Sequence, residues 1–487
     1  MNNNLEPREV FSIFAQINQV PRPSKHEERI SQWLQDFARE HSIDYTVDEA
    51  MNVIMRKPAT EGYEQHEGII LQAHMDMVCE KNNDVQHDFF NDPIQTYVDG
   101  EWLKAQGTTL GADNGIGIAM ALAVMTDDTL KHPALECLFT VDEETGLTGA
   151  FKLQDGYLNG KRLINLDSED DGQIFIGCAG GIDTLAKMHY MPAPLPASHR
   201  WFAVRLSVSG LMGGHSGDDI NKGRGNANKV IVNFLNLLMT KTEFQLASIS
   251  GGNLRNAIAR EAEALVCVPM EYKEQLRADW NIYIADVERE LAAVEKDMHL
   301  ELESAPLPDT VIPEKQAYQL IMALYACPHG MVAMSKDMPG LVETSTNLAS
   351  IKMKAEADGT PYVEINTSQR SSVETQKHHI KDRVEYSLAM ACDEVTHGDG
   401  YPGWAPNVHS PLLEATKQAY VDLFHTAPQV LAIHAGLECG LFLEKYPYLD
   451  MVSIGPQMYG VHSPQERLSI PSTARCYQWL RHTLETL

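Results

Sequence analysis

The sequence predicts an α/β protein: a catalytic domain with a mixed, mostly parallel sheet between helices, plus an inserted α+β domain. Two observations predict this class. In the first part of the chain, short apolar strands such as GIILQAH (68–74) alternate with helices such as GIGIAMALAVM (115–125). That alternation is typical of a sheet whose two faces are covered by helices. After residue 192 the pattern changes to half-exposed strands such as FAVRLSV (202–208), which are typical of antiparallel sheets.

The elements of the first part follow in order. Apolar residues spaced three and four apart predict helices at 9–17 and 26–41. The segment 115–125 is apolar on all sides, which predicts a buried helix. Strands are expected at 44–48, 52–57, 68–74, 134–142 and 162–167.

Two proline- and glycine-rich breaks divide the chain. The first is MPAPLPA (191–197) and the second is HGDGYPGWAP (397–406). Between them strands and helices follow in an α+β pattern, including a long amphipathic helix at 271–297. We therefore expect a catalytic domain made of residues 1–187 and 398–487, and an inserted lid and dimerisation domain at 188–397.

Composition excludes several functions. Asp and Glu number 67 and Lys and Arg 39, so the net charge of −28 opposes binding to nucleic acid and to anionic membranes. The longest apolar run, 118–125, is too short to span a bilayer, and the first residues contain no signal peptide. The eight cysteines are scattered and form no CxxC pair, which is typical of reduced thiols. These features predict a soluble cytoplasmic protein.

Histidine and acidic side chains follow the ends of the expected strands, where ligands bind in open α/β sheets. They are His74 and Asp76, Asp113, Glu143 and Glu144, Asp167, and His462. Each alone has an ordinary explanation, such as a helix N-cap for Asp113. Their shared topological position favours a common site.

The donor types suit two divalent cations. Imidazole and carboxylate without thiolate are typical of catalytic zinc, manganese or cobalt. Two such ions can share a water molecule, convert it to hydroxide and polarise a carbonyl group. Asp76 lies two residues after His74 and can hold its second ring nitrogen. Either Glu143 or Glu144 must remain unligated and act as the general base.

Five motifs in this order, HMD, GADNG, DEETG, NLDSED and HSPQER, resemble the co-catalytic dizinc peptidase family of carboxypeptidase G, peptidase T and carnosinase. The segments GLMGGHSGDDI, VETSTNLA, INTSQRSS and HAGLECG are similar to those of its bacterial aminoacyl-histidine dipeptidases. The resemblance covers nearly the whole chain.

The resemblance implies a role for each matching residue. His74, Asp113 and Asp167 are implied ligands of one metal ion, which is expected to be zinc, with cobalt or manganese as alternatives. Asp113, Glu144 and His462 are implied ligands of the second ion, so that Asp113 bridges the pair. Glu143 is the implied general base, and Asp76 the implied orienting partner of His74.

Four further positions match the inserted domain and the segment near residue 436. His215 is implied to stabilise the oxyanion, and Arg370 to bind the C-terminal carboxylate of the substrate. Asn256 and Gly436 are implied substrate-binding residues. The family often has proline where Ala259 stands, and GGT where this chain reads AGLE.

The sequence thus predicts a dinuclear metallo-dipeptidase. It would cleave free dipeptides with an unblocked N-terminus, including Xaa-His and carnosine-type substrates, by attack of a hydroxide that bridges two metal ions. The alternatives are an N-acyl amino acid deacylase or a tripeptidase on the same scaffold, or a non-catalytic metal-binding protein. The resemblance also implies a homodimer.

Overall fold

The computed structural model describes residues 5–487, which form two compact units. Unit 1 contains the chain up to Cys178 together with Trp404–Ala432 and Leu437–Leu487, and unit 2 contains Ala179–Gly403 and Ile433–Gly436. The inserted unit begins nine residues earlier and ends six residues later than the insert expected at 188–397. The reason is strand β9 (Gly180–His189), which pairs with β16 (Pro361–Ser371) over its whole length and so belongs to the sheet of unit 2.

Unit 1 is built on an eight-stranded sheet in the order β1-β2-β6-β3-β7-β19-β8-β18. The sheet is mixed, as predicted, and its parallel pairs, β6 with β3, β3 with β7 and β7 with β19, lie at the centre. The strands are β1 (Asp44–Val47), β2 (Val53–Lys57), β3 (Ile69–His74), β6 (Leu135–Thr140), β7 (Arg162–Asn165), β8 (Gln173–Cys178), β18 (Gln429–Ile433) and β19 (Asp450–Ser453). All six residues of β3 and of β6 are buried, as expected for strands covered on both faces.

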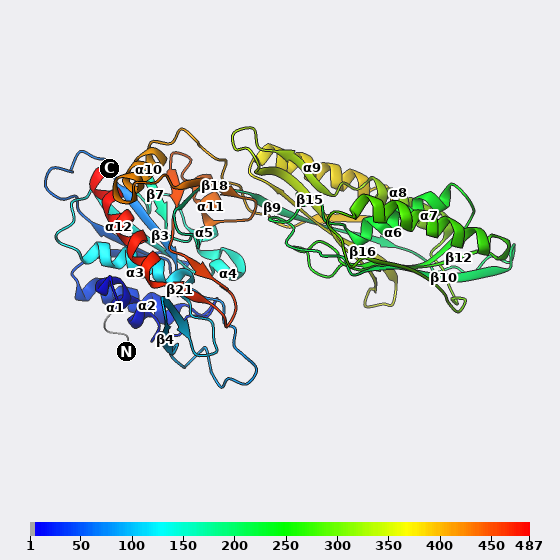
Figure 1. The fold of residues 1–487 in the computed structure, drawn as a ribbon, viewed down its shortest axis with the longest axis horizontal. Helices are drawn as coiled ribbons and strands as arrows, with labels where there is room; N and C mark the ends of the chain where they lie inside the picture. The colour runs from blue at the N-terminus through cyan, green and yellow to red at the C-terminus, as the bar shows by residue number, and fades with distance from the viewer. Residues whose placement is uncertain (1–4) are drawn as a thin grey trace. The chain divides into compact units, whose positions relative to one another are not determined.

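Helix α3 (Ala112–Thr126) packs between α1 (Arg8–Ile17) and β3, and nearly all of its residues are buried. The prediction of a buried helix is therefore confirmed. The other helices of unit 1 are α2 (Glu28–Glu40), α4 (Glu143–Gly146), α5 (Thr148–Lys152), α10 (Pro411–Phe424), α11 (Glu438–Lys445) and α12 (Ile470–Thr486). Figure 1 shows α1, α3 and α12 gathered beside β3.

A small four-stranded sheet in unit 1 was not predicted. It joins the hairpin β4 (Thr96–Asp99) and β5 (Trp102–Ala105) to β20 (Met458–Tyr459) and β21 (Arg467–Ser469). The turn between β20 and β21 carries His462. Pairing of β21 with β5 therefore fixes the base of that turn.

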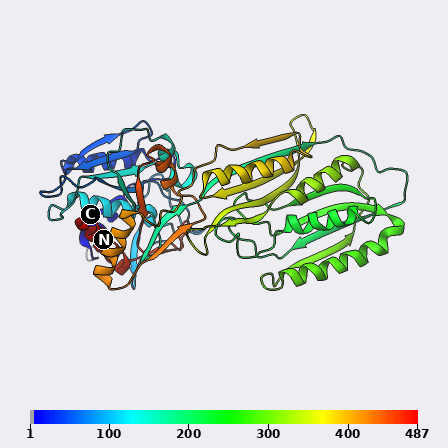
Figure 2. The ribbon, with the colours of Figure 1, turned by 90° about the horizontal axis from the view of Figure 1, so that it is seen from above.

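Unit 2 contains a nine-stranded antiparallel sheet with its helices over one face (Figures 1 and 2). The strands are β9, β10 (Trp201–Ser209), β11 (Gln245–Gly251), β12 (Ala262–Pro269), β13 (His299–Ser304), β14 (Gly330–Met334), β15 (Val342–Ala355), β16 and β17 (Glu394–His397). The helices are α6 (Ala227–Met239), α7 (Lys273–Leu291), α8 (Glu314–Ala326) and α9 (Glu374–Leu388). A 3₁₀ turn at Met270–Tyr272 leads directly into α7. The core lies between helices and sheet. The helix expected at 271–297 ends at Leu291, six residues early.

Within residues 5–487, no helix combines the length and apolarity that a membrane span requires. All eight cysteines are free thiols, and all except the partly exposed Cys79 are buried. The expectation that the N-terminus contains no signal peptide falls in part on residues 1–4, which lie outside the described residues.

Candidate metal centre

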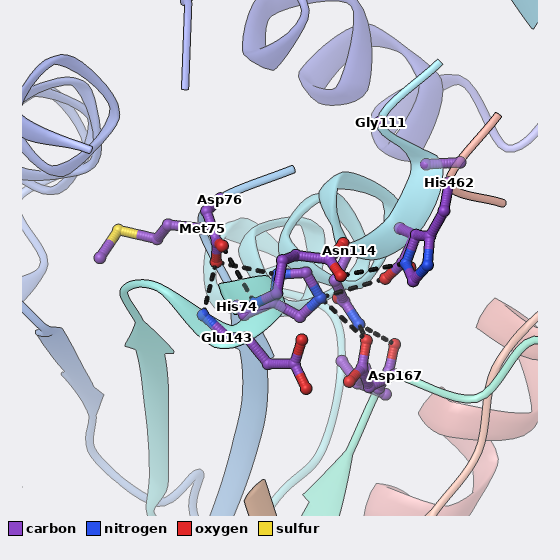
Figure 3. A network of polar contacts seen from close by, with 12 residues as sticks. His74, Met75, Asp76, Gly111, Asn114, Glu143, Asp167 and His462 are labelled. Atoms are coloured by element: carbon purple, nitrogen blue, oxygen red, sulfur yellow. Dashed lines mark hydrogen bonds and ion pairs between the residues drawn. The ribbon is translucent and has the colours of Figure 1, made fainter. Parts of the chain in front are cut away.

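The candidate site of unit 1 lies where three neighbouring strands of the sheet end. His74 is the last residue of β3, Glu143 begins the short helix α4 just after β6, and Asp167 follows β7. These strands are parallel, and the register places His74 opposite Thr140 of β6. Their carboxyl ends therefore meet at one edge of the sheet, and Figure 3 shows these three side chains gathered there.

Asp113 lies between two imidazole rings. Its Oδ1 atom is 3.1 Å from Nε2 of His74, and its Oδ2 atom is 3.1 Å from Nε2 of His462. Asp113 lies in the first turn of α3 but has non-helical backbone angles, which separate it from the regular helix that follows. One carboxylate thus faces both histidines.

Each imidazole has a second carboxylate beside it. Asp167 Oδ1 is 3.3 Å from Nε2 of His74, and Glu144 Oε2 is 3.0 Å from Nε2 of His462. The structure thus brings together two sets of three side chains that share Asp113. These sets are His74, Asp113 and Asp167, and Asp113, Glu144 and His462.

The donor atoms fit divalent cations. His74, Asp113 and Glu144 each offer a ligand atom within 4.8 Å of the others, and within residues 5–487 Oε1 of Glu144 is buried without a hydrogen-bond partner. Nitrogen and oxygen donors of this kind suit zinc and similar metals. The cluster could therefore hold two ions that share Asp113.

Burial and close packing shift the pKa values of the acidic and imidazole side chains in this cluster. Burial raises the pKa of Glu143 well above its usual range, and burial with the nearby Asp113 raises that of Glu144. Hydrogen bonds to Asp113 and Glu144 raise the pKa of His462 to about 11. In the protein alone, imidazolium charge offsets the carboxylates, a task that bound cations would take over.

Asp76 connects two parts of the cluster. It is fully buried, and its Oδ1 atom is 3.3 Å from Nδ1 of His74. Its carboxylate also accepts hydrogen bonds from the backbone N–H groups of Glu143 and Glu144, at 3.0 and 3.2 Å. Figure 3 shows the backbone nitrogen of Glu143 facing Asp76, with the Glu143 side chain extending away from it. Asp76 thus orients the ring of His74 and the turn that carries both glutamates.

Sequence reasoning missed three supporting residues. Glu466 accepts hydrogen bonds from the backbone of the loop before Asp113. Arg22, which is buried, donates to the carbonyl oxygens of Met75, Asp76 and Gly111, and Asn114 donates to Asp167. Glu466 lies in the same HSPQER motif as His462, so the motif could have identified it as a site residue. No pattern in the sequence around Arg22 indicates its role.

The four remaining site residues predicted from the sequence lie in unit 2. His215 and Asn256 belong to adjacent segments, because the backbone N–H of Ser216 donates to the carbonyl of Asn256 at 2.8 Å. Arg370 and Gly436 both adjoin Tyr401. Arg370 donates to its hydroxyl at 3.1 Å, and Gly436 lies against its ring.

Known proteins with similar sequences were found over the whole chain. The chain is 42% identical over 486 residues to the cytosol non-specific dipeptidase of Escherichia coli (strain K12), covering 100% of this chain and 99% of that protein. The crystal structure of aminoacylhistidine dipeptidase from Vibrio alginolyticus matches with a TM-score of 0.94 and 40% identity, over 100% of this chain and 98% of that one.

A more distant likeness concerns the fold alone. The structure of the aminopeptidase PepT from Bacillus cereus matches with a TM-score of 0.62 and 15% identity, over 99% of each chain.

The model of peptidase family M20/M25/M40 matches residues 70–486. This match includes every residue of the two three-residue sets described above. The chain therefore belongs to peptidase family M20/M25/M40.

Proposed function

We propose that this protein is a metal-dependent dipeptidase that cleaves free dipeptides with an unblocked N-terminus, including Xaa-His and carnosine-type substrates. The observation that carries the proposal is the position of Asp113 between His74 and His462. The names of the two relatives that match over the full chain, both dipeptidases, support the substrate class.

The proposed ligands follow from the two sets of side chains. His74, Asp113 and Asp167 would hold one ion, and Asp113, Glu144 and His462 the other. Zinc is the proposed metal, and cobalt or manganese would suit the same donors. Divalent cations held there would polarise a carbonyl oxygen and make water more acidic.

Glu143 is the proposed general base. No hydrogen bond to its carboxylate occurs among the described residues, whereas its backbone nitrogen is held by Asp76. The carboxylate is thus free to take the proton of the attacking water and to deliver it to the nitrogen of the leaving amine. Asp76 would keep the ring of His74 in one orientation during this transfer.

The unit 2 residues would contact the substrate. The His215 ring would donate to the oxygen of the tetrahedral intermediate, and Arg370 would bind the C-terminal carboxylate through its planar fork of donors. Asn256 and Gly436 are proposed to line the substrate site. Unit 2 would then serve as the lid and dimerisation domain of a homodimer.

Localisation completes the proposal. We propose a cytoplasmic enzyme, supported by the word "cytosol" in the name of the E. coli relative and by the free cysteines. Reduced buried thiols are ordinary in that compartment.

A substrate panel tests the proposed function. The zinc-loaded protein is assayed with an Xaa-His dipeptide, the corresponding tripeptide and N-acetyl-histidine. We expect kcat/KM for the dipeptide to exceed the other two values by about a hundredfold or more. A preference for N-acetyl-histidine would identify a deacylase, and a preference for the tripeptide would identify a tripeptidase. Absence of turnover with every metal tried would overturn the enzyme proposal.

A further inference from the structure

The backbone of Tyr401 is held firmly within unit 2. Its N–H donates to the carbonyl of Gly181 at 2.8 Å, and its carbonyl accepts from the N–H of Gly181 at 3.0 Å. The buried ammonium group of Lys377 donates to the same Tyr401 carbonyl at 2.7 Å. These three hydrogen bonds fix the backbone from which the ring extends.

The ring of Tyr401 lies against two glycines. A Cβ atom at Gly181 would stand 2.6 Å from Cζ and Oη of the ring, and one at Gly436 would stand 2.8 Å from Cε2. Neither position can accept a side chain unless the ring is displaced. Gly436 was expected from the sequence to contact substrate, but the ring by itself accounts for a glycine there.

The hydroxyl of Tyr401 meets the guanidinium group of Arg370. Nη1 of Arg370 donates to Oη of Tyr401 at 3.1 Å, and Arg370 pairs with Gly181 in the sheet. Arg370 is only 8% exposed. Its Nε atom is buried without a hydrogen-bond partner among the described residues. One terminal nitrogen is therefore anchored, while the Nε edge of the fork retains an unused donor.

We propose that Tyr401 is a positioning residue that fixes the plane of the Arg370 guanidinium and thereby sets the preference for substrates with a free C-terminal carboxylate. The proposal rests on the carboxylate-binding role proposed for Arg370 above. Bidentate binding of a carboxylate requires the fork to lie in one plane with it, so an anchored guanidinium binds better than a mobile one. Gly181 and Gly436 contribute by leaving room for the ring.

The Tyr401→Phe variant tests the hydroxyl and keeps the ring. It is assayed with one Xaa-His dipeptide and with the C-terminal amide of the same dipeptide. We expect KM for the free acid to rise about tenfold with kcat nearly unchanged, and KM for the amide to change less than twofold. Tyr386→Phe, the same change at a tyrosine that is 70% exposed, serves as the control. Equal changes of KM for both substrates would overturn the proposal.

Arg370→Ala separates this proposal from the one on which it rests. If Arg370→Ala weakens the acid but not the amide, while Tyr401→Phe affects neither, the role of Tyr401 is wrong and that of Arg370 stands. If Arg370→Ala weakens both substrates equally, the carboxylate-binding role fails and the role of Tyr401 fails with it.

A double-mutant cycle tests the explanation for Gly436. Gly436→Ala should raise KM for the free acid in the wild-type background by displacing the Tyr401 ring. In the Tyr401→Ala background the same change should raise KM less than twofold, because the ring that it would strike is gone. An equal effect in both backgrounds would show that Gly436 acts independently of Tyr401.

Discussion

The Glu466 carboxylate accepts hydrogen bonds from four consecutive backbone N–H groups, those of residues 110–113, at 2.7 to 3.4 Å. The last of these residues is Asp113, which faces both histidines of the cluster. Glu466 itself follows His462 by only four residues. The short segment 462–466 therefore places His462 in the cluster. Through Glu466 it also fixes the loop that carries Asp113, the carboxylate that both histidines face.

Glu466→Ala should lower both stability and metal affinity. The substitution leaves several buried N–H groups unsatisfied and also removes one of the carboxylates that lie near the buried Arg22. We expect a loss of about 3 kcal/mol in the free energy of unfolding, measured in urea, and a weaker zinc affinity, measured by titration calorimetry. Glu288→Ala, at an exposed position of α7, is the control. Unchanged zinc affinity would contradict the link between Glu466 and Asp113.

Glu143→Ala should separate metal binding from turnover. Glu143 belongs to neither three-residue set, so the variant should retain its metal content by elemental analysis. Loss of the proton acceptor should lower kcat by about a hundredfold or more. Normal turnover would remove Glu143 from the role of base, and loss of metal would instead place its carboxylate among the ligands.

Gly117→Ala should disturb the support of Asp167. A Cβ atom at Gly117 would collide with Oδ1 of Asn114 and would stand 2.7 Å from the carbonyl oxygen of Leu166. Since Asn114 donates to Asp167, the collision should reach the cluster. We expect destabilisation of about 2 kcal/mol by thermal or urea unfolding, together with lower metal occupancy.

The matched control for Gly117 is Gly398→Ala. A Cβ atom at Gly398 would meet nothing within 4 Å, so the same chemical change should alter the free energy of unfolding by less than about 1 kcal/mol. Equal losses in both variants would mean that the close approach of Gly117 to Asn114 carries no particular cost.

The site was predictable where local pattern and topology coincide. His74 ends one apolar strand and Asp167 lies just beyond another, and parallel strands end at a common edge, so their meeting could be expected from the sequence. Glu466 and Arg22 act through hydrogen bonds to backbone atoms that are remote in the chain, and no local pattern reports such contacts. The placement of residues 179–187 in unit 2 was not visible in the sequence for a similar reason, because it depends on the pairing of β9 with β16.

The small sheet of unit 1 shows another limit. Strands β20 and β21 contain two and three residues, too few for a period of alternation to be recognised. The pairing partner of β21 outside this turn is β5, which lies more than 350 residues earlier in the chain. Only the folded structure shows that this pairing fixes the turn of His462.

His434 should make unit 2 less stable in acid. His434 is only 5% exposed. Burial and the charge of the nearby Arg370 lower the pKa of its imidazole to about 4. An unfolded histidine titrates near 6.5, so between pH 6.5 and 4 the unfolded chain binds a proton that the folded chain does not. The free energy of unfolding should therefore fall as pH falls, by about 2 kcal/mol from this group between pH 6.5 and 5.

His434→Asn tests this dependence in metal-free protein. The difference in unfolding free energy between wild type and variant should shrink by about 2 kcal/mol from pH 7 to pH 5, because only the wild type carries the penalty. His378→Asn, the same change at an exposed position of α9, serves as the control. A constant difference for His434→Asn would show that this histidine protonates in the folded protein.

Removal of the metal ions should destabilise unit 1 selectively. Asp113, Glu144 and Asp167 gather around two histidines at one edge of the sheet, and without cations their negative charges repel one another. Binding to the folded state alone stabilises it by about 4 kcal/mol when free metal is a thousandfold above its dissociation constant. Chelation should therefore speed hydrogen exchange in α3, which begins at the cluster, and zinc should restore the slow rates. Exchange in α6 of unit 2, which contains none of the proposed ligands, is the internal control. Equal acceleration in α3 and α6 would mean that the stabilising effect does not arise at this cluster.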